Sequence, residues 1–470
     1  MERYVVMAFQ MIVQIIIARI LDPSDYGIVS MMTVFIAIAT IFIQNGFNMA
    51  LVQKKEADET DFSTALMVNV AIGIFMYAVI ALSSPAIARF YNQPFIAKCL
   101  PVMSLLLVFG SVNSIQIAIA NRKMMFGNLF KCNVVSSIVS GVLGVASALY
   151  GFGVWALVIQ QLSQSVILSI MLLLQQHWVP NWTFRKESAK SLFSFGWKLL
   201  AAGLLNQIYK ELNSLVIGKR YTSSDLAYYT KGNQFPKYFT MGVDSSIGSV
   251  MFAAFSKNQA DCKSLHSLMK KTIIVNSYLI IPLLALLAMV AHPMVTVLLT
   301  DKWQPLVPFL RICCVTCALH PLASTQVQAI AAVGRSDVRL KIEIVKKGIG
   351  IGLLILAVPY GPLAIAISAA IAGVIGVIIG AVACSVITSY PFKNLVTDNL
   401  PVLISTIISM APLYLIGKIS LNPILLILVE CVVGLGLYLF ISALFNLYGF
   451  HYLKEYINQH FRRLYKHTGD

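Results

Sequence analysis

The sequence has few charged residues. Only 11% of its 470 residues are Asp, Glu, Lys or Arg, whereas soluble domains average about 25%. Apolar residues make up 58% of the chain, and no polar stretch between the apolar runs is long enough to form a soluble domain. A water-soluble fold is therefore excluded. The sequence also lacks the alternating pattern of a membrane β-barrel, so it predicts an all-α integral membrane protein.

Acidic residues are the scarcer charged type, 19 against 35 Lys and Arg, and the net charge is +16. A nucleic-acid partner would require the basic residues to gather on one surface, but they are scattered through short loops. Alternate loops carry most of them, and Lys and Arg are retained on the cytoplasmic side of a membrane. The sequence therefore predicts a protein of the cell inner membrane with both termini in the cytoplasm, and no nucleic-acid partner.

Catalytic and metal-binding motifs are missing as well. We find no HExxH, no GxxxxGK[ST] and no external cluster of His, Asp and Glu. The eight cysteines lack the spacing of a disulfide framework, so Cys314 and Cys317 are interpreted as buried small residues. The sequence predicts a transporter without a bound cofactor or metal, not an enzyme.

Apolar runs near the length of a membrane crossing recur along the whole chain. A helix needs about 20 apolar residues to cross the hydrocarbon core, and polar punctuation divides the chain into about fourteen such spans. The predicted spans are 3–21, 26–52, 62–87, 97–120, 127–149, 153–176, 192–217, 226–254, 272–299, 305–332, 341–359, 361–389, 397–417 and 423–447.

Three weak internal echoes indicate two related halves. Their members lie six spans apart, an even number, so the halves share one orientation in the membrane. The echoes pair 19–27 with 219–227, 120–122 with 334–335, and 150–156 with 360–364. The resulting organisation is an N-terminal lobe at 1–178, a cytoplasmic linker at 179–191, a C-terminal lobe at 192–390, two extra helices at 391–450 and a basic cytoplasmic tail at 451–470.

Ionisable residues inside the predicted spans mark the candidate site, because each costs at least a few kcal/mol unless it faces protein or water. The span at 226–254 carries the densest stripe, at mostly three- and four-residue steps. Its members are Lys231, Gln234, Lys237, Tyr238, Asp244 and Ser245. Lys237 is about 10 Å along the axis from Asp244, too far for an ion pair, and is a candidate ligand for a substrate anion. Alternatively, both lysines extend to the membrane surface and Asp244 pairs with another helix.

The span at 192–217 repeats this theme. Asn206 and Lys210 share one face, and Lys198 lies nearer the cytoplasmic end. In the alternative interpretation, Glu211 simply neutralises Lys210.

The span at 341–359 has an apolar run too short to cross the membrane alone. The crossing must therefore include Glu343, Lys346 and Lys347. Glu343 and Lys347 have the spacing of an i,i+4 ion pair, which leaves Lys346 without an obvious intrahelical partner. Arg311 in the span at 305–332 either faces the interior or extends to the membrane surface.

Bases outnumber acids in these spans, which favours an anionic substrate bound through phosphate or carboxylate groups. The candidate substrate site, in a central cavity, consists of Lys198, Asn206, Lys210, Lys231, Lys237, Asp244, Arg311, Lys346 and Lys347.

Several stretches, in order along nearly the whole chain, also resemble a known family. Residues 17–27 are similar to that family's ARxLxPxDxG start, and the other stretches are 45–53, 195–198, 217–219, 309–312 and 332–335. On these stretches the chain resembles the polysaccharide transporter (O-antigen flippase) family, in the branch of lipopolysaccharide, colanic-acid and teichuronic-acid exporters. This family belongs to the multidrug/oligosaccharidyl-lipid/polysaccharide flippase superfamily.

The resemblance implies a V-shaped, MATE-like arrangement of two six-helix lobes. It implies a flippase that moves undecaprenyl-pyrophosphate-linked oligosaccharide repeat units outward by alternating access, for capsule, exopolysaccharide or O-antigen synthesis. The partners expected are the lipid-linked saccharide, membrane lipids, and a polysaccharide polymerase with other assembly proteins, with coupling to an H+ or Na+ gradient. The alternatives are a cation-coupled multidrug or small-molecule antiporter of the same fold and a membrane-embedded polysaccharide polymerase.

Overall fold

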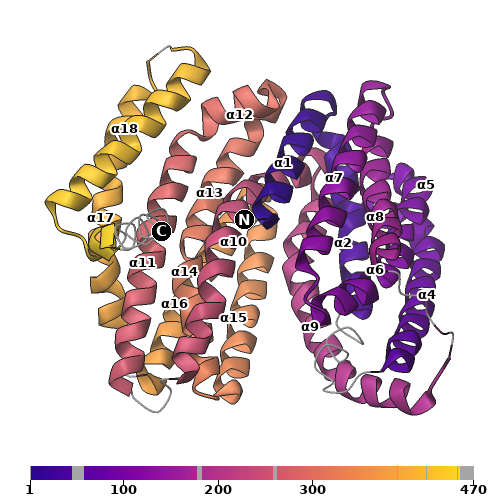
Figure 1. The fold of residues 1–470 in the computed structure, drawn as a ribbon. Coiled ribbons are helices and arrows are strands. Elements are labelled where there is room, and N and C mark those ends of the chain that lie inside the picture. Colours follow the sequence, from indigo (N-terminus) through magenta and orange to yellow (C-terminus); the bar gives the residue numbers. More distant parts are fainter. Residues whose placement is uncertain are drawn as a thin grey trace, which may run out of the picture. The chain divides into compact units, whose positions relative to one another are not determined.

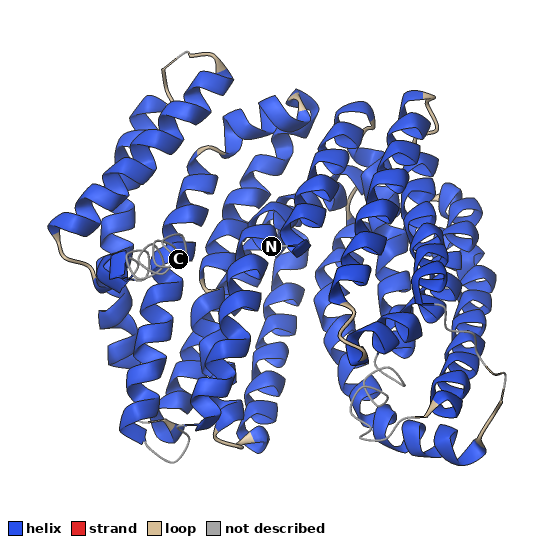
Figure 2. Cartoon of the chain, in the orientation of Figure 1, coloured by secondary structure: helices blue, strands red, loops and turns tan. Residues whose placement is uncertain are grey.

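The described part of the chain is helical apart from short turns, and it contains no strand (Figure 2). The computed structural model describes residues 2–44, 58–176, 181, 183–257, 262–388, 390–419, 421–452 and 454–455, without the side chains of 2–4, 188–195, 198, 241–250, 252–253 and 262. The all-α prediction is confirmed. The stretch at 45–53 and most of the predicted tail lie outside these residues.

Ten helices of this part are long and apolar enough to cross a membrane, so the chain is a multi-pass membrane protein. They overlap ten of the predicted spans, and four helices overlap the others. These four are α1 (Glu2–Ile20), α9 (Lys186–Arg220), α10 (Ser223–Lys257) and α15 (Ser336–Ala357). α9, α10 and α15 carry the charged residues singled out above, which lower their hydropathy. The total of about fourteen spans stays a prediction.

The chain forms two compact units, which divide between Tyr228 and Tyr229. Unit 1 comprises Met1–Tyr228 and unit 2 comprises Tyr229–Asp470. The lobe boundaries expected from the internal echoes stay a prediction.

The described part of unit 1 contains α1, α9 and the short first part of α10, together with six further helices (Figure 1). These are α2 (Pro23–Gln44), α4 (Glu59–Tyr91), α5 (Pro94–Met103), α6 (Leu105–Arg122), α7 (Phe126–Leu149) and α8 (Val154–Gln176). The predicted span at 97–120 is broken at Ser104 into α5 and α6. α9 packs on α2 and α4.

The first internal echo has matching backbone geometry in its two copies. At the start of α2, the Asp25 carboxylate accepts from the Asp22 N–H at 3.4 Å. At the start of α10, the Asp225 carboxylate accepts from the Thr222 N–H at 3.1 Å, and the Asp225 N–H donates to the Thr222 hydroxyl. An acid at the third helical position that caps the preceding N–H stabilises a helix start.

The helices of unit 1 are joined by polar side chains and small residues rather than by apolar burial alone. Gln14 on α1 donates to Gln160 on α8 at 3.1 Å, and a Cβ at Gly144 of α7 would press on that same Gln160. Asn113 on α6 donates to the Ser165 carbonyl at 3.1 Å and accepts from Ser169 at 2.6 Å. Lipid tails offer no hydrophobic drive for helix association, so such contacts specify the packing.

Replacing Asn113 by alanine is expected to lower the free energy of unfolding of the purified protein by about 1 to 2 kcal/mol, because it removes the hydrogen bonds of its side chain with Ser165 and Ser169 of α8. Thermal unfolding in detergent measures the effect. Asn133→Ala is the matched control, since the Asn133 amide bonds only to the Leu129 carbonyl of its own helix among its described contacts. An equal loss in both variants would contradict the interhelical role of Asn113.

The described part of unit 2 contains the rest of α10, α15 and seven further α-helices. These are α11 (Cys262–Met289), α12 (Ala291–Leu299), α13 (Val307–Ala318), α14 (His320–Ala332), α16 (Pro362–Ile387), α17 (Phe392–Ile416) and α18 (Pro423–Leu444). Two 3-10 turns also occur, η1 (Asp301–Leu306) before α13 and η2 (Val358–Tyr360) after α15. The predicted spans at 272–299 and 305–332 are each broken, after Met289 and at Leu319.

The two helices predicted to lie outside the repeat, α17 and α18, both pack against α11. The Tyr438 hydroxyl of α18 donates to the Tyr278 carbonyl of α11 at 3.1 Å. Tyr278, Val402 and Tyr438 belong to one buried cluster that joins the three helices. α17 and α18 are thus a structural part of unit 2.

Candidate functional site

The predicted stripe on α10 lies against α13 within unit 2. The rings of Tyr229 and Phe309 stand edge to face with centroids 6.4 Å apart. Gly232 lies so close to the α13 backbone that an added Cβ would be 3.0 Å from the Leu310 nitrogen. Residues later in α10 contact residues later in α13, so the two helices lie side by side and run in the same direction.

Lys231 and Lys237 differ in environment although both belong to this stripe. Lys231 is half-buried next to Gly232, whereas Lys237 is exposed and lies within electrostatic range of Cys313 and Cys317 on α13. Cys313, Cys314 and Cys317 are free and buried, as the sequence predicts for Cys314 and Cys317. The Asp244 side chain lies outside the described residues.

Lys346 has the most specific environment of the predicted residues. Its aliphatic stem lies on two glycines of α16, with its Cδ 3.5 Å from a Cβ built at Gly376 and its Nζ 3.5 Å from a Cβ built at Gly380. Gln326 of α14, which is 1% exposed, reaches the same Gly380 and donates to the Val377 carbonyl at 3.3 Å. The glycines thus provide the groove in which a half-buried ammonium group is held among α14, α15 and α16.

The Gln326 side-chain oxygen is buried, and no described protein group donates a hydrogen bond to it. This oxygen and the Lys346 ammonium group both lie next to Gly380. A buried acceptor beside a cation creates a polar position within an apolar bundle. The neighbouring Lys347 is also half-buried and has interactions of its own.

Arg311 is exposed, but it interacts with two other helices. Its Nε donates to the Ala288 carbonyl at the end of α11 at 3.1 Å, and it interacts electrostatically with Glu430 of α18. It therefore joins α13 to α11 and α18, and its neighbours differ from those of Lys346.

Sequence reasoning missed Glu430. This acid is 2% exposed within the apolar helix α18, and one carboxylate oxygen lies 3.2 Å from a Cβ built at Gly417. The other oxygen has no hydrogen-bond donor among the described residues. A single acid in a 22-residue apolar helix is a detectable signal. It was overlooked because the last two spans were placed outside the repeat.

The predicted residues of α9 belong to unit 1. Asn206 and Lys210 are exposed, and Glu211 accepts a hydrogen bond from Gln207 at 2.9 Å. The Lys198 side chain is not among those described. The candidate residues are thus distributed over both units, and within unit 2 they form three local groups around α13, α16 and α18.

Metal ligation finds no support in the described side chains, since no group of three or more His, Cys, Asp or Glu among them could hold an ion. The chemistry of the described groups is instead that of lysine and arginine donors placed beside amides and backbone carbonyls. Such donors bind phosphate and carboxylate oxygens.

Comparison with known proteins identifies relatives over most of the chain. A family model described as "Polysaccharide biosynthesis protein" matches residues 16–308. Teichuronic acid biosynthesis protein TuaB of Bacillus subtilis (strain 168) is 25% identical over 64% of this chain and 62% of its own length. Succinoglycan biosynthesis transport protein ExoT of Rhizobium meliloti (strain 1021) is 23% identical over 69% of this chain and 65% of its own length. The chain thus spans less than two thirds of these two relatives.

A third relative is matched over more of its length. Lipopolysaccharide biosynthesis protein WzxC of Escherichia coli (strain K12) is 23% identical over 78% of this chain and 72% of its own length.

Solved structures share the fold at low sequence identity. A lipid II flippase MurJ in an inward closed conformation has a TM-score of 0.73 at 16% identity, covering 94% of this chain and 97% of that chain. An inward-facing multidrug resistance MATE family transporter has a TM-score of 0.61 at 15% identity, covering 81% of this chain and 96% of that chain. The predicted MATE-like class of fold is confirmed.

Proposed function

Since the chain belongs to the polysaccharide biosynthesis protein family that matches residues 16–308, we propose that it is a flippase for lipid-linked oligosaccharides. In this proposal it moves undecaprenyl-pyrophosphate-linked repeat units across the cytoplasmic membrane by alternating access, for capsule, exopolysaccharide or O-antigen synthesis. It is a transporter in this view, not an enzyme.

The observation that carries the proposal is the lysine held inside the bundle of unit 2. Lys346 lies on Gly376 and Gly380 beside the buried Gln326 amide, in a membrane protein. An ammonium group in a membrane bundle is costly without a function or a partner. Glu343 interacts with it electrostatically from the same helix, and a pyrophosphate is an anion that an ammonium group binds well. The names of TuaB, ExoT and WzxC, all polysaccharide biosynthesis or transport proteins, support the substrate class.

A reconstitution experiment tests this function. The purified protein is placed in vesicles with a fluorescent undecaprenyl-pyrophosphate-linked saccharide, and a membrane-impermeant glycosidase reports the fraction exposed outside. We expect the protein to accelerate exposure of this lipid and to leave a phosphatidylcholine analogue unaffected. Equal rates for both lipids would indicate unspecific scrambling, and transport of cationic dyes instead of the lipid would establish the antiporter alternative.

The proposal includes a location and partners. The excess of basic residues in alternate loops supports a position in the cytoplasmic membrane with both termini inside. A reporter fused to the C-terminus that is active only in the cytoplasm tests this orientation. A polysaccharide polymerase and other assembly proteins are the expected partners, and glycosyltransferase and polymerase genes beside this gene would support them.

We also propose that transport is coupled to an H+ gradient through Glu430. This acid is buried in α18, and Arg311 of α13 interacts with its charged form. Protonation would remove that attraction, so a proton on Glu430 changes how α13 and α18 hold each other. An Na+ gradient imposed instead of the H+ gradient distinguishes the two ions.

Replacing Glu430 by glutamine is expected to reduce H+-driven transport about tenfold or more while transport without a gradient continues, since a coupling group worth about 1.4 kcal/mol changes an equilibrium by that factor. Flux in vesicles with and without an imposed pH difference measures it. Glu187→Gln on α9 is the matched control, as it removes an exposed acid from another helix. Gradient-driven flux that persists in Glu430→Gln would refute the coupling role.

A further inference from the structure

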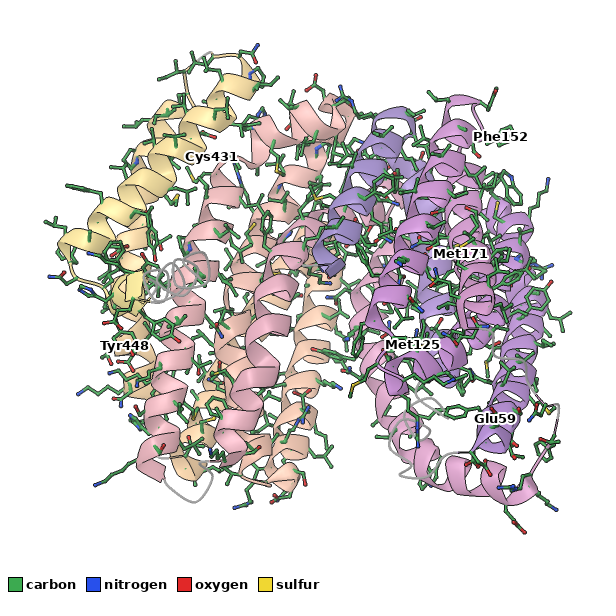
Figure 3. All side chains as sticks on the ribbon, viewed as in Figure 1. Glu59, Met125, Phe152, Met171, Cys431 and Tyr448 are labelled. Carbon is green, nitrogen blue, oxygen red and sulfur yellow. The ribbon has the colours of Figure 1, made fainter. Side chains whose placement is uncertain are left out.

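A cavity in unit 2 lies away from the groups described above. It has a volume of about 680 Å³ and is bounded by α11, α17 and the segment that follows α18. One wall carries Lys270 and Asp398, and another is formed by Phe445 and Tyr448; Tyr448 is labelled in Figure 3. Its size suits an amphipathic small molecule or part of a lipid.

The polar end of the cavity is a built ion pair. The Lys270 ammonium group lies 2.8 Å from one Asp398 carboxylate oxygen, and the Tyr390 hydroxyl donates to the other at 2.9 Å. The Asp398 side chain is 10% exposed, whereas that of Lys270 is 47% exposed. The carboxylate therefore fixes the ammonium group from the protein side, and an ammonium group has two further N–H donors to offer.

The hydroxyl of Tyr390 stays protonated in this arrangement. Tyr390 lies in the turn before α17, and burial, together with the adjacent Asp398 carboxylate, raises its pKa well above the usual range. It therefore acts as a permanent donor to Asp398. Lys270 is held in place without being fully covered.

The remainder of the cavity wall is an apolar stripe. Leu400, Ile404 and Ile408 follow each other at four-residue steps on α17, so they lie on one face and extend about 12 Å along the axis. Each is 46 to 49% exposed on a helix apolar enough to cross a membrane. The ion pair lies about 9 to 12 Å from the starts of α11 and α17, and the apolar stripe follows it further along α17. The polar end and the apolar stripe of the cavity therefore have the order of a lipid headgroup and its acyl chain.

Charge at this end of unit 2 is strongly biased. Residues 262–274 and 390–408 contain four lysines and one acid, Asp398. Beyond the Lys270–Asp398 pair, Lys263, Lys271 and Lys393 are exposed at the same helix ends. A headgroup with a net negative charge is therefore favoured over a zwitterionic one.

We propose that this cavity binds a phospholipid with an anionic headgroup, with the phosphate on the Lys270 ammonium group and an acyl chain along Leu400, Ile404 and Ile408. The site is separate from the groups proposed to bind the transported saccharide. It does not depend on the proposed function.

Binding of short-chain phosphatidylglycerol to the purified full-length protein in detergent tests the site, with phosphatidylcholine of the same chains as reference and native mass spectrometry as the readout. Both lipids offer the same phosphate to Lys270, but the lysines at this end of unit 2 repel the choline ammonium group of phosphatidylcholine, so we expect the wild type to prefer phosphatidylglycerol about tenfold or more. The double variant Lys270→Gln with Asp398→Asn should lose this preference. It removes both charges together, so no buried acid is left unpaired.

Lys271→Gln is the matched control, because it removes a lysine charge one residue away from Lys270 at a position that does not line the cavity. It should keep the preference. An equal loss in Lys271→Gln would assign the preference to general surface charge and overturn the proposal. Ile404→Trp should weaken both lipids by filling the apolar part of the cavity, and unchanged binding would also overturn it. Displacement of the lipid by millimolar inorganic phosphate would identify a free-anion site instead.

Discussion

Replacing Lys346 by glutamine is expected to lower transport of the lipid-linked saccharide about 30-fold, because a charge-assisted hydrogen bond to phosphate contributes about 2 kcal/mol. The amount of folded protein in the membrane should not change. Glutamine keeps most of the stem that packs on Gly376 and Gly380, so the variant removes the charge and preserves the packing. Flux in vesicles, normalised to protein, measures the effect.

The matched control for this prediction is Lys341→Gln. Lys341 is an exposed lysine on α15, five residues before Lys346, and its replacement makes the same change in net charge. We expect it to retain nearly full flux. Equal flux in Lys346→Gln and wild type would remove Lys346 from the substrate site while leaving the flippase assignment open to the other lysines.

A second variant tests the same groove from its opposite side. A Cβ at Gly380 would overlap the Gln326 side-chain oxygen and approach the Lys346 ammonium group. Gly380→Ala should therefore also reduce flux. Since both residues belong to one groove, the double variant should lose less flux than the product of the two separate fold-reductions. Independent effects would mean that Gly380 acts through packing alone.

Replacing Gly27 by alanine is expected to destabilise the protein by about 3 kcal/mol, the upper part of the range for an overpacked site. A Cβ at Gly27 of α2 would lie well inside the van der Waals radius of the Ser223 carbonyl oxygen at the start of α10. That atom belongs to the backbone, so it cannot turn aside as a flexible side chain would. Thermal unfolding in detergent and the yield of folded protein measure the loss.

Gly110→Ala is the control for Gly27→Ala. Gly110 lies in the interior of α6, and nothing surrounds the position its Cβ would take within 4 Å. Alanine there should be neutral or stabilise the helix by up to about 1 kcal/mol. A comparable loss at both positions would show that glycine replacement in unit 1 is harmful in general.

Gly27 also lies where the two copies of the first internal echo contact each other. It ends the stretch at 17–27, and its neighbour in space, Ser223, belongs to the other copy of the same internal echo. The two echo copies, about 200 residues apart, therefore meet within unit 1. The sequence shows that the two segments are alike, but it does not show that they touch.

The helical class, the membrane setting and most helix positions follow from the sequence by itself. A membrane leaves helices and closed barrels as the only backbones with every N–H and C=O satisfied, so apolar runs of sufficient length predict helices without knowledge of their neighbours. The free, buried state of Cys314 and Cys317 was predictable because they lie in an apolar run and lack the spacing of a disulfide framework. The breaks at Ser104 and Leu319 do not show in hydropathy, although Pro321 in the first turn of α14 is a local signal for the second one.

Only the tertiary structure decided what the intramembrane charges are for. Hydropathy shows that Lys346, Arg311 and Glu430 are costly where they are, but their partners come from helices distant in sequence. Lys346 lies on glycines of α16, Arg311 of α13 interacts electrostatically with Glu430 of α18, and Lys270 is held by Asp398 of α17. The strength of an electrostatic interaction depends on the distance between the charges and on how far they are removed from water, so the fold determines which charge remains available to a ligand.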